Sequence, residues 1–405
     1  MKIRKVGFLW LISMLIISSF IGCQSKEEHL QVDTPSSHKP KAVAPEEEEV
    51  KWEDWLYFRE DAKNTLVRMA LGRQKEERVA DHISQWLLEE DQLLYTTQED
   101  WESLDTSTEP LTIINELLIA NLDGSEAKLL AGKESTLDVA TPYEGRQSYL
   151  RYGPLGVVDS WVYFNVTIGL SGTDASQSTI FRMHSNGEDL EEVCKLKSND
   201  MVYSFGVIGE TMYFTSGYMQ DNYDLTLYQV DLETKISQVL TERGVVLGKY
   251  EEALYYEETT GDNGVNNYQI NKIVSGQSEN YIEKVTSIDH TSDALYFNLQ
   301  EHNIYIGRKI FNEGYGEFVK YNEVYDLKKK ETRVSLPDEQ GFPGGGASTK
   351  VISTKGTATY YLQYLNEWNW LSDLKVVDTS TNTETVLKKE IIEPKLIRLQ
   401  VQNNQ

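Results

Sequence analysis

The sequence has little cysteine, little proline and no excess of basic residues, and each shortage excludes a class of protein. Two Cys among 405 residues cannot build a disulfide scaffold. Nine Pro and 27 Gly are too few for a fibrous chain. Lys and Arg number 39 against 64 Asp and Glu, so the formal net charge is -25 and the chain offers no counterion release to a phosphate backbone. Nucleic acid is therefore excluded as a main partner.

One long apolar run stands at the N-terminus. Basic residues at positions 2, 4 and 5 precede the apolar segment 6–20, which has the length of a signal peptide rather than of a membrane span. The run ends at Gly22-Cys23, and an apolar run that ends in a small residue followed by Cys resembles the bacterial lipoprotein signal. The resemblance implies that residues 1–22 are removed and that the Cys23 thiol is acylated, for example with palmitate. An uncleaved N-terminal anchor with an incidental Cys is the alternative.

Both alternatives place the rest of the chain on the extracytoplasmic face of the cell membrane. Residues 23–50 are dominated by Ser, Pro, Lys and Glu, include four consecutive Glu at 46–49, and have no apolar periodicity. This composition predicts a disordered acidic tether that starts at the lipidated Cys23. The folded domain is therefore expected to occupy residues 51–405.

A short apolar strand with a Tyr near its centre recurs along that domain at a mean spacing of about 50 residues. The copies are Leu56-Tyr57-Phe58, Leu93-Leu94-Tyr95, Val162-Tyr163-Phe164, Met212-Tyr213-Phe214, Leu254-Tyr255-Tyr256, Leu295-Tyr296-Phe297 and Thr359-Tyr360-Tyr361. Each copy is followed by a second apolar strand, a polar turn and a third strand. Some of the turns hold Asp-Gly or Asn-Gly pairs, as at 123–124 and 186–187, which supply the positive φ of tight hairpins.

Four short antiparallel strands per 50 residues are typical of a β-propeller blade. We therefore predict an all-β fold, a β-propeller of four-stranded antiparallel blades. The repeats predict seven blades, with six or eight as alternatives because their spacing is irregular. Segment 396–401 alternates apolar and polar residues, and the first repeat lacks an inner strand of its own. The C-terminal strand is therefore expected to close the propeller.

Three segments carry a resemblance to the TolB-like and low-density-lipoprotein-receptor-like tandem-repeat propellers, and especially to bacterial lipoproteins of unknown function. They are Leu66-Val67-Arg68-Met69, Ile180-Phe181-Arg182-Met183-His184-Ser185-Asn186-Gly187 and Leu225-Thr226-Leu227-Tyr228-Gln229-Val230-Asp231. The resemblance spans about residues 52–401 and implies the fold rather than a function. The Tyr-Trp-Thr-Asp signature of the receptor group is missing.

Motifs of known catalytic or metal chemistry are missing from the sequence. It holds no Gly-X-Ser-X-Gly, no His-Glu-X-X-His and no sialidase box, and the six His have no ligand spacing. Loops 221–224 and 261–267 are rich in oxygen ligands that suit calcium, but hairpin loops carry Asp, Asn and Gly for backbone reasons as well. We therefore predict no catalytic residue, no metal site and no cofactor. Cys194 is expected to be a small buried hydrophobe.

The candidate ligand-binding residues lie in loops. In a propeller, the loops between second and third strands emerge on the same face as the loops between blades, so distant residues converge there. Two Trp that lie two apart would face one side of a hairpin, where they could stack on a ligand or pack as local core. The candidate residues are Trp368, Trp370, Tyr218, Tyr223, Asp221, Asp224, Arg146 and Arg151.

Three functions follow from this reading. The first is a lipid-anchored binding or protein-interaction module that holds a glycan, a peptide or a partner protein. The alternative is an extracytoplasmic polysaccharide hydrolase or lyase that uses pore-facing carboxylates. A third is an accessory lipoprotein that works only within an envelope complex.

Overall fold

The computed structural model describes residues 52–60, 64–89, 91–133, 137, 139, 142–218, 225–261, 266–276, 280–291, 295–312, 316–335, 349–364, 371–381 and 383–400. Contacts divide the chain into two units, Met1–Glu49 and Val50–Gln405, and the second holds all of the described residues. Cys23 and the predicted tether lie outside them. Within the part of the chain that the structure describes, no helix has the length and apolar character needed to cross a membrane.

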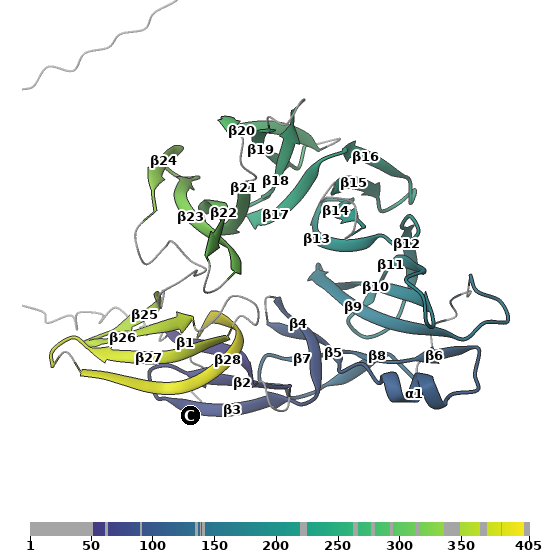
Figure 1. The fold of residues 1–405 in the computed structure, drawn as a ribbon, viewed down its shortest axis with the longest axis horizontal. Coiled ribbons are helices and arrows are strands. Elements are labelled where there is room, and N and C mark those ends of the chain that lie inside the picture. Colours follow the sequence, from purple (N-terminus) through teal and green to yellow (C-terminus); the bar gives the residue numbers. More distant parts are fainter. Residues whose placement is uncertain are drawn as a thin grey trace, which may run out of the picture. The chain divides into compact units, whose positions relative to one another are not determined.

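The strands that the structure describes form six sheets (Figure 1). The largest has the order β25 (Thr349–Lys355), β26 (Ala358–Tyr364), β27 (Leu371–Asp378), β28 (Thr383–Gln400), β1 (Trp52–Glu60), β2 (Thr65–Ala70) and β3 (Lys75–Ala80). The next contains β4 (Ile83–Glu89), β5 (Gln92–Thr97), β7 (Leu117–Asn121) and β8 (Lys128–Ala131). A third has the order β12 (Glu191–Lys195), β11 (Ser176–His184), β10 (Trp161–Leu170), β9 (Ser148–Val158) and β6 (Leu111–Ile113).

The other three sheets are four-stranded and follow chain order. The first contains β13 (Met201–Ile208), β14 (Thr211–Gly217), β15 (Thr226–Asp231) and β16 (Ser237–Thr241). The second contains β17 (Gly244–Tyr250), β18 (Ala253–Thr260), β19 (Asn266–Val274) and β20 (Tyr281–Thr291), and the third β21 (Leu295–Gln300), β22 (Asn303–Asn312), β23 (Gly316–Asp326) and β24 (Glu331–Val334). Neighbouring strands are antiparallel except β6 and β9, and the helix of the described chain is the six-residue α1 (Trp101–Thr106).

Inner strands such as β1 are apolar on both faces because their sheets pack against neighbouring layers. Successive side chains of a strand point to opposite faces. On β1, Leu56 and Phe58 join the cluster that includes Leu374 of β27, whereas Trp55 and Tyr57 join the cluster that includes Leu93. Further clusters connect the later sheets in chain order, from the sheet that begins with β4 to the sheet of β21–β24. Antiparallel sheets that pack face to face in succession form a β-propeller, which confirms the predicted all-β fold.

The C-terminal strand joins the two ends of the domain, as predicted. The first half of β28 pairs with β27, and its second half pairs with β1, with Trp52 opposite Gln400 (Figure 1). The strands β26 and β1 belong to one hydrogen-bonded sheet, yet their side chains Tyr360 and Leu56 pack against the same apolar cluster, as residues of two facing layers do. The strand β28 therefore belongs to two packed layers. The described strands thus form six hydrogen-bonded sheets. The predicted number of seven blades is reached only if the seven-stranded sheet is counted as two blades that share β28.

The Tyr-centred repeat marks the same strand in all but one copy. Six anchors lie on β1, β5, β10, β14, β18 and β26, which are the second strands of their layers. The copy Leu295-Tyr296-Phe297 lies instead on β21, the first strand of its sheet. There, the second strand is β22, whose Ile304 and Ile306 are buried. At this point the repeat therefore predicts the second strand one strand too early, because both segments have a similar apolar pattern.

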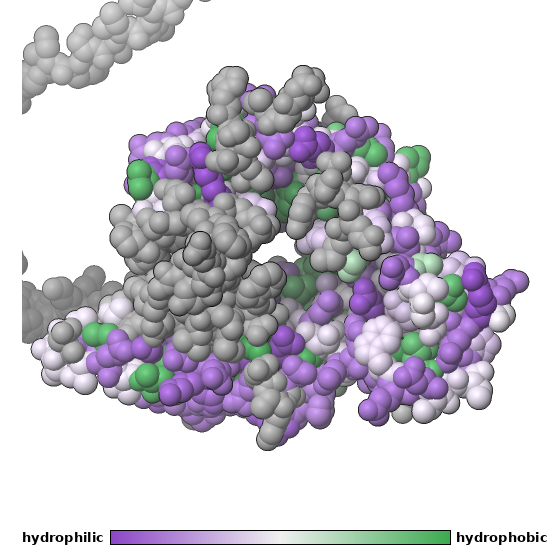
Figure 2. All heavy atoms as spheres, in the orientation of Figure 1, coloured by the Kyte–Doolittle hydropathy of each residue, from purple (hydrophilic) through white to green (hydrophobic). Residues whose placement is uncertain are grey.

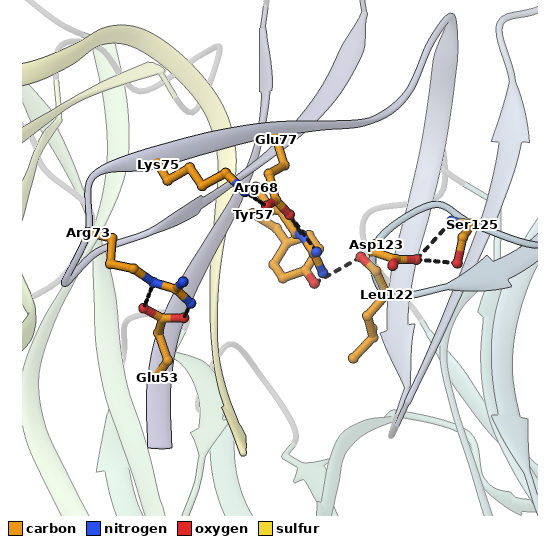
Figure 3. A network of polar contacts seen from close by, with 9 residues as sticks. All are labelled: Glu53, Tyr57, Arg68, Arg73, Lys75, Glu77, Leu122, Asp123 and Ser125. Carbon is orange, nitrogen blue, oxygen red and sulfur yellow. Dashed lines mark hydrogen bonds and ion pairs between the residues drawn. The ribbon is translucent and has the colours of Figure 1, made fainter. Parts of the chain in front are cut away.

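A polar ladder crosses three strands and ties neighbouring layers together (Figure 3). On β1, β2 and β3, Tyr57 lies opposite Arg68, which lies opposite Glu77. Arg68 Nε donates to Glu77 Oε2 at 2.8 Å, and its guanidinium lies 4.4 Å from the centre of the Trp55 ring. The Tyr57 hydroxyl donates to the carbonyl oxygen of Leu122 in the next sheet at 2.9 Å.

The sheet of β9–β12 repeats this ladder. Tyr163 lies opposite Arg182, and Arg182 lies opposite Glu191. Arg182 Nε donates to Glu191 Oε2 at 2.8 Å, and the guanidinium lies 4.2 Å from the centre of the Trp161 ring. Lys235 of the following sheet donates to the same Glu191 oxygen at 2.6 Å. The ladder is thus part of the repeat and contributes contacts between adjacent layers.

Candidate functional site

A cavity of about 280 Å³ lies between the strands β4, β9 and β13, which belong to three successive sheets. Its size is near the lower end of the range of small-ligand sites, roughly 300–1,000 Å³. The described residues that line it include polar, aromatic and aliphatic side chains. They are Gln85, Trp86, Leu87, Glu99, Arg151, Tyr152, Gly153, Pro154, Leu155, Asn165, Met201, Val202, Tyr203, Ser204 and Phe205.

The charged groups of the cavity form one ion pair. Arg151 Nη1 lies 3.4 Å from Glu99 Oε1, and the two side chains are 29% and 23% exposed. The pair neutralises itself, so the cavity presents no strong net charge. Among the described lining residues, Glu99 is the single carboxylate. Hydrolysis of a glycosidic bond uses two carboxyl groups, so this cavity does not favour the hydrolase alternative.

An asparagine and a glycine shape one wall. Asn165 Nδ2 donates to Thr167 Oγ1 at 3.1 Å, which holds the amide in place. The Asn165 Oδ1 atom lies above Gly153, where an added Cβ would meet it at 2.3 Å. Gly153 is therefore required for this position of the amide. On the facing strand β13, the Ser204 hydroxyl is buried and has no hydrogen-bond partner among the described residues. An unsatisfied buried hydroxyl is unfavourable, and a ligand or a water molecule would relieve it.

Two aromatic residues that line the cavity, Trp86 and Tyr203, differ in their exposure to solvent. Trp86 is buried, and the Lys395 ammonium lies 4.2 Å from the centre of its ring. Tyr203 is 42% exposed and stands at a shift in the register of β13 against β14. Bulges of this kind redirect a side chain. Tyr203 is thus the most exposed aromatic side chain of the described lining.

One residue predicted from the sequence lines this cavity. Arg151 does so, whereas the exposed Arg146 lies beside Tyr143, with its guanidinium carbon 5.8 Å from that ring's centre. Tyr218 follows β14 and does not line the cavity. The predicted residues Trp368, Trp370, Tyr223, Asp221 and Asp224 lie outside the described residues, and the convergence expected for them stays a prediction.

Sequence reasoning missed Glu99, Asn165 and Tyr203. A signal existed for Asn165, a polar residue inside the apolar run of β10, where it is flanked by Phe164 and Val166. The other two carried no signal because a bulge and a loop bring them to the cavity. Cys194 packs beside an apolar cluster, and burial raises the pKa of its thiol. Across the described ranges, no group of three or more His, Cys, Asp or Glu is placed to hold a metal ion.

The surface in view is mainly hydrophilic. Figure 2 shows apolar residues there as small, separate patches among the described atoms. A broad apolar docking surface is therefore not seen among the described residues on this face.

No family model matches the sequence, and no curated protein matches it at a significant level. Solved structures do match. TolB from Acinetobacter baumannii is 15% identical, with 82% of this chain and 79% of that chain covered and a TM-score of 0.36. The β-propeller domain of the Trilobed protease from Pyrococcus furiosus is 12% identical, with 84% and 95% covered and a TM-score of 0.45. A Mycobacterium tuberculosis puromycin-hydrolyzing peptidase is 13% identical, with 85% and 54% covered and a TM-score of 0.46.

The class of protein follows from the strand topology: the chain is a β-propeller protein. TolB, a member of the group that the repeats resemble, is among the matches, but likeness at this level implies nothing about a ligand or an activity. The similarity to bacterial lipoproteins and to receptor-type repeats stays a prediction from the sequence.

Proposed function

We propose that this protein is a lipid-anchored lipoprotein of the extracytoplasmic face, whose propeller acts as a binding or protein-interaction module for a glycan, a peptide or a partner protein. The observation that supports binding is the cavity between β4, β9 and β13, with its compensated ion pair and its unsatisfied Ser204 hydroxyl. The N-terminal sequence up to Cys23 supports the lipid anchor.

The lining favours a neutral, polar ligand group. Because Arg151 and Glu99 already neutralise one another, a ligand with a net charge would meet no uncompensated counter-charge among the described lining residues. The amides of Gln85 and Asn165 and the hydroxyl of Ser204 offer both donors and acceptors. The partly exposed ring of Tyr203 offers a face for stacking. Sugar hydroxyls and peptide amides both suit this combination.

Binding can be tested by thermal shift of the full-length chain with cell-wall oligosaccharides and with short neutral peptides. A ligand at 100 times its Kd stabilises the folded state by about 2.7 kcal/mol. We expect one of the two ligand classes to raise the Tm, and Tyr203→Ala to abolish the rise. Tyr281→Ala is the matched control, because Tyr281 is similarly exposed, at 47%, but does not line the cavity. If neither class shifts the Tm, or both variants lose the shift equally, binding at this cavity is disproved.

The lipid anchor can be tested by metabolic labelling with an alkyne analogue of palmitate, followed by fractionation. We expect the wild-type chain to carry the label and to be found in the membrane fraction. The Cys23→Ser variant should lose both the label and its presence in the membrane fraction. Cys194→Ser, which changes the other Cys of the sequence, should keep both. An unlabelled wild type, or a labelled Cys23→Ser variant, contradicts the anchor without bearing on the cavity.

A further inference from the structure

A second cavity, of about 530 Å³, lies between the sheet of β13–β16 and the sheet of β17–β20. It is separate from the first, since it lies beyond the far end of β13. Its described lining is polar throughout. The residues that matter for its chemistry are Glu210, Tyr213, Gln229, Asp231, Gln238 and Asn280.

This cavity lies beside the strand positions that form the polar ladder in other sheets. Tyr213 lies opposite Gln229, and Gln229 lies opposite Gln238. The register is the same as that of Tyr57, Arg68 and Glu77, and as that of Tyr163, Arg182 and Glu191. In those two layers an arginine fills the middle position and pairs with the acid. The β17–β20 sheet also has a cation there, because Lys272 lies opposite Tyr255 and pairs with Glu283 at 2.7 Å. In the β13–β16 sheet two glutamines replace the pair, and the cavity lies beside them.

The charge of the cavity is negative. Glu210 and Asp231 line it, and no Lys or Arg is among its described lining residues. The backbone N–H and the hydroxyl of Thr234, with the Glu233 N–H, donate to Asp231 Oδ1 and hold the pKa of this carboxyl below its ordinary value, so the group is a carboxylate at neutral pH. Lys235 of the same turn is near enough to lower the pKa of Asp231 further, but its ammonium donates to Glu191 of the preceding sheet. Glu210 and Asp231 therefore line a cavity beside the position that an arginine or a lysine fills in the other ladders.

The wall opposite is held in place. Asn280 Nδ2 donates to the Tyr213 hydroxyl at 3.1 Å and to the Ile208 carbonyl oxygen at 3.0 Å. These bonds link the two sheets and keep the Tyr213 oxygen at the cavity. The planar, multi-donor guanidinium matches carboxylate, amide and phenol oxygens better than an ammonium does.

We propose that this cavity is a docking site for an arginine side chain presented by a partner polypeptide. The guanidinium takes the place that Arg68 and Arg182 hold in the sister layers, with Glu210 and Asp231 as its counter-charges. This site does not depend on the first cavity or on the lipid anchor.

The test uses the full-length chain and three probes, measured by calorimetric titration. N-acetyl-arginine amide is expected to bind, with an affinity that falls as salt is raised. N-acetyl-citrulline amide has the same shape without the charge and should bind at least about tenfold more weakly, since a charged hydrogen bond contributes roughly 1.5–3 kcal/mol. Free arginine, whose charged α-ammonium and carboxylate replace the two neutral amides of a polypeptide, should bind no more tightly than the blocked form. Equal binding of the arginine and citrulline probes overturns the proposal, and tighter binding of free arginine overturns the polypeptide partner.

Two variants locate the site. The double variant Gln229→Arg with Gln238→Glu builds the sister ladder and is expected to abolish binding of the arginine probe without lowering the Tm. Glu210→Gln should weaken it about tenfold, and this single change keeps the test valid if the double variant does not fold. Tyr203→Ala, in the first cavity, is the control and should bind the probe normally. Binding that survives both the double variant and Glu210→Gln overturns the proposal.

Discussion

Replacing Glu257 with glutamine is expected to stabilise the protein at pH 8 by up to about 3 kcal/mol. The residue lies on β18, partly exposed as a whole, but its Oε2 atom is buried and has no hydrogen-bond partner among the described residues. Burial raises the pKa of this carboxyl to about 7, while the nearby Arg243 partly offsets the effect. At pH 8 the folded protein therefore holds a buried carboxylate without a hydrogen-bond partner at Oε2, and glutamine removes its charge.

The sign of the pH dependence follows from the two pKa values. In the unfolded chain the carboxyl titrates at its ordinary value of 4.5, and in the folded protein at about 7. Between these values the folded state binds more protons, so the free energy of unfolding falls as pH rises from about 4.5 to 7 and stays low above pH 7. The wild type and Glu257→Gln should therefore differ little near pH 4.5 and most at pH 8.

Urea unfolding at pH 5 and pH 8 measures this difference. A general relief of repulsion in a chain of net charge -25 could also stabilise any variant that loses an acid. Glu252→Gln, on the exposed turn before β18, controls for that effect and should change stability by less than about 0.5 kcal/mol. A Glu257→Gln variant that loses stability between pH 5 and pH 8 as steeply as the wild type would contradict the expectation.

The fold was largely predictable because its repeat is local. Tyr57 and Tyr163 mark second strands since an apolar strand packed on both faces leaves a dense, regular pattern in the sequence. The pairing of β28 with β1 could also be inferred, because the first layer lacked an inner strand. Tyr296 shows the limit, since first and second strands share the same apolar pattern and only the partner strands distinguish them.

The cavities were less predictable because they depend on side chains from different sheets. Arg151 was predicted for an unusual local concentration of Arg and Tyr, but its partner Glu99 lies 52 positions earlier in the chain. The glutamines 229 and 238 look ordinary in the sequence. Only the strand register shows that they lie at the positions that Arg182 and Glu191 occupy in the neighbouring sheet.

Replacing Gly124 with alanine is expected to destabilise the protein by about 3 kcal/mol or more, for two separate reasons. Gly124 has a φ of +82°, which a residue with a Cβ adopts only under strain. In addition, an added Cβ would lie 2.1 Å from the Val79 carbonyl oxygen on β3. This oxygen belongs to the backbone of the neighbouring layer, so it cannot rotate away as a side chain would. The turn must move, and the hydrogen bond from the Tyr57 hydroxyl to Leu122 in the same turn is expected to break.

Gly172→Ala separates the two contributions. Its φ is +73°, close to that of Gly124, but nothing lies within 4 Å of an added Cβ. This variant therefore measures the backbone strain alone, about 1 kcal/mol. Thermal and urea unfolding of the two variants should show a much larger loss for Gly124→Ala, and the excess reports how tightly this turn docks on β3. Equal losses would mean that the turn moves away from β3 without penalty, and that the bond from the Tyr57 hydroxyl to Leu122 does not hold the two layers together.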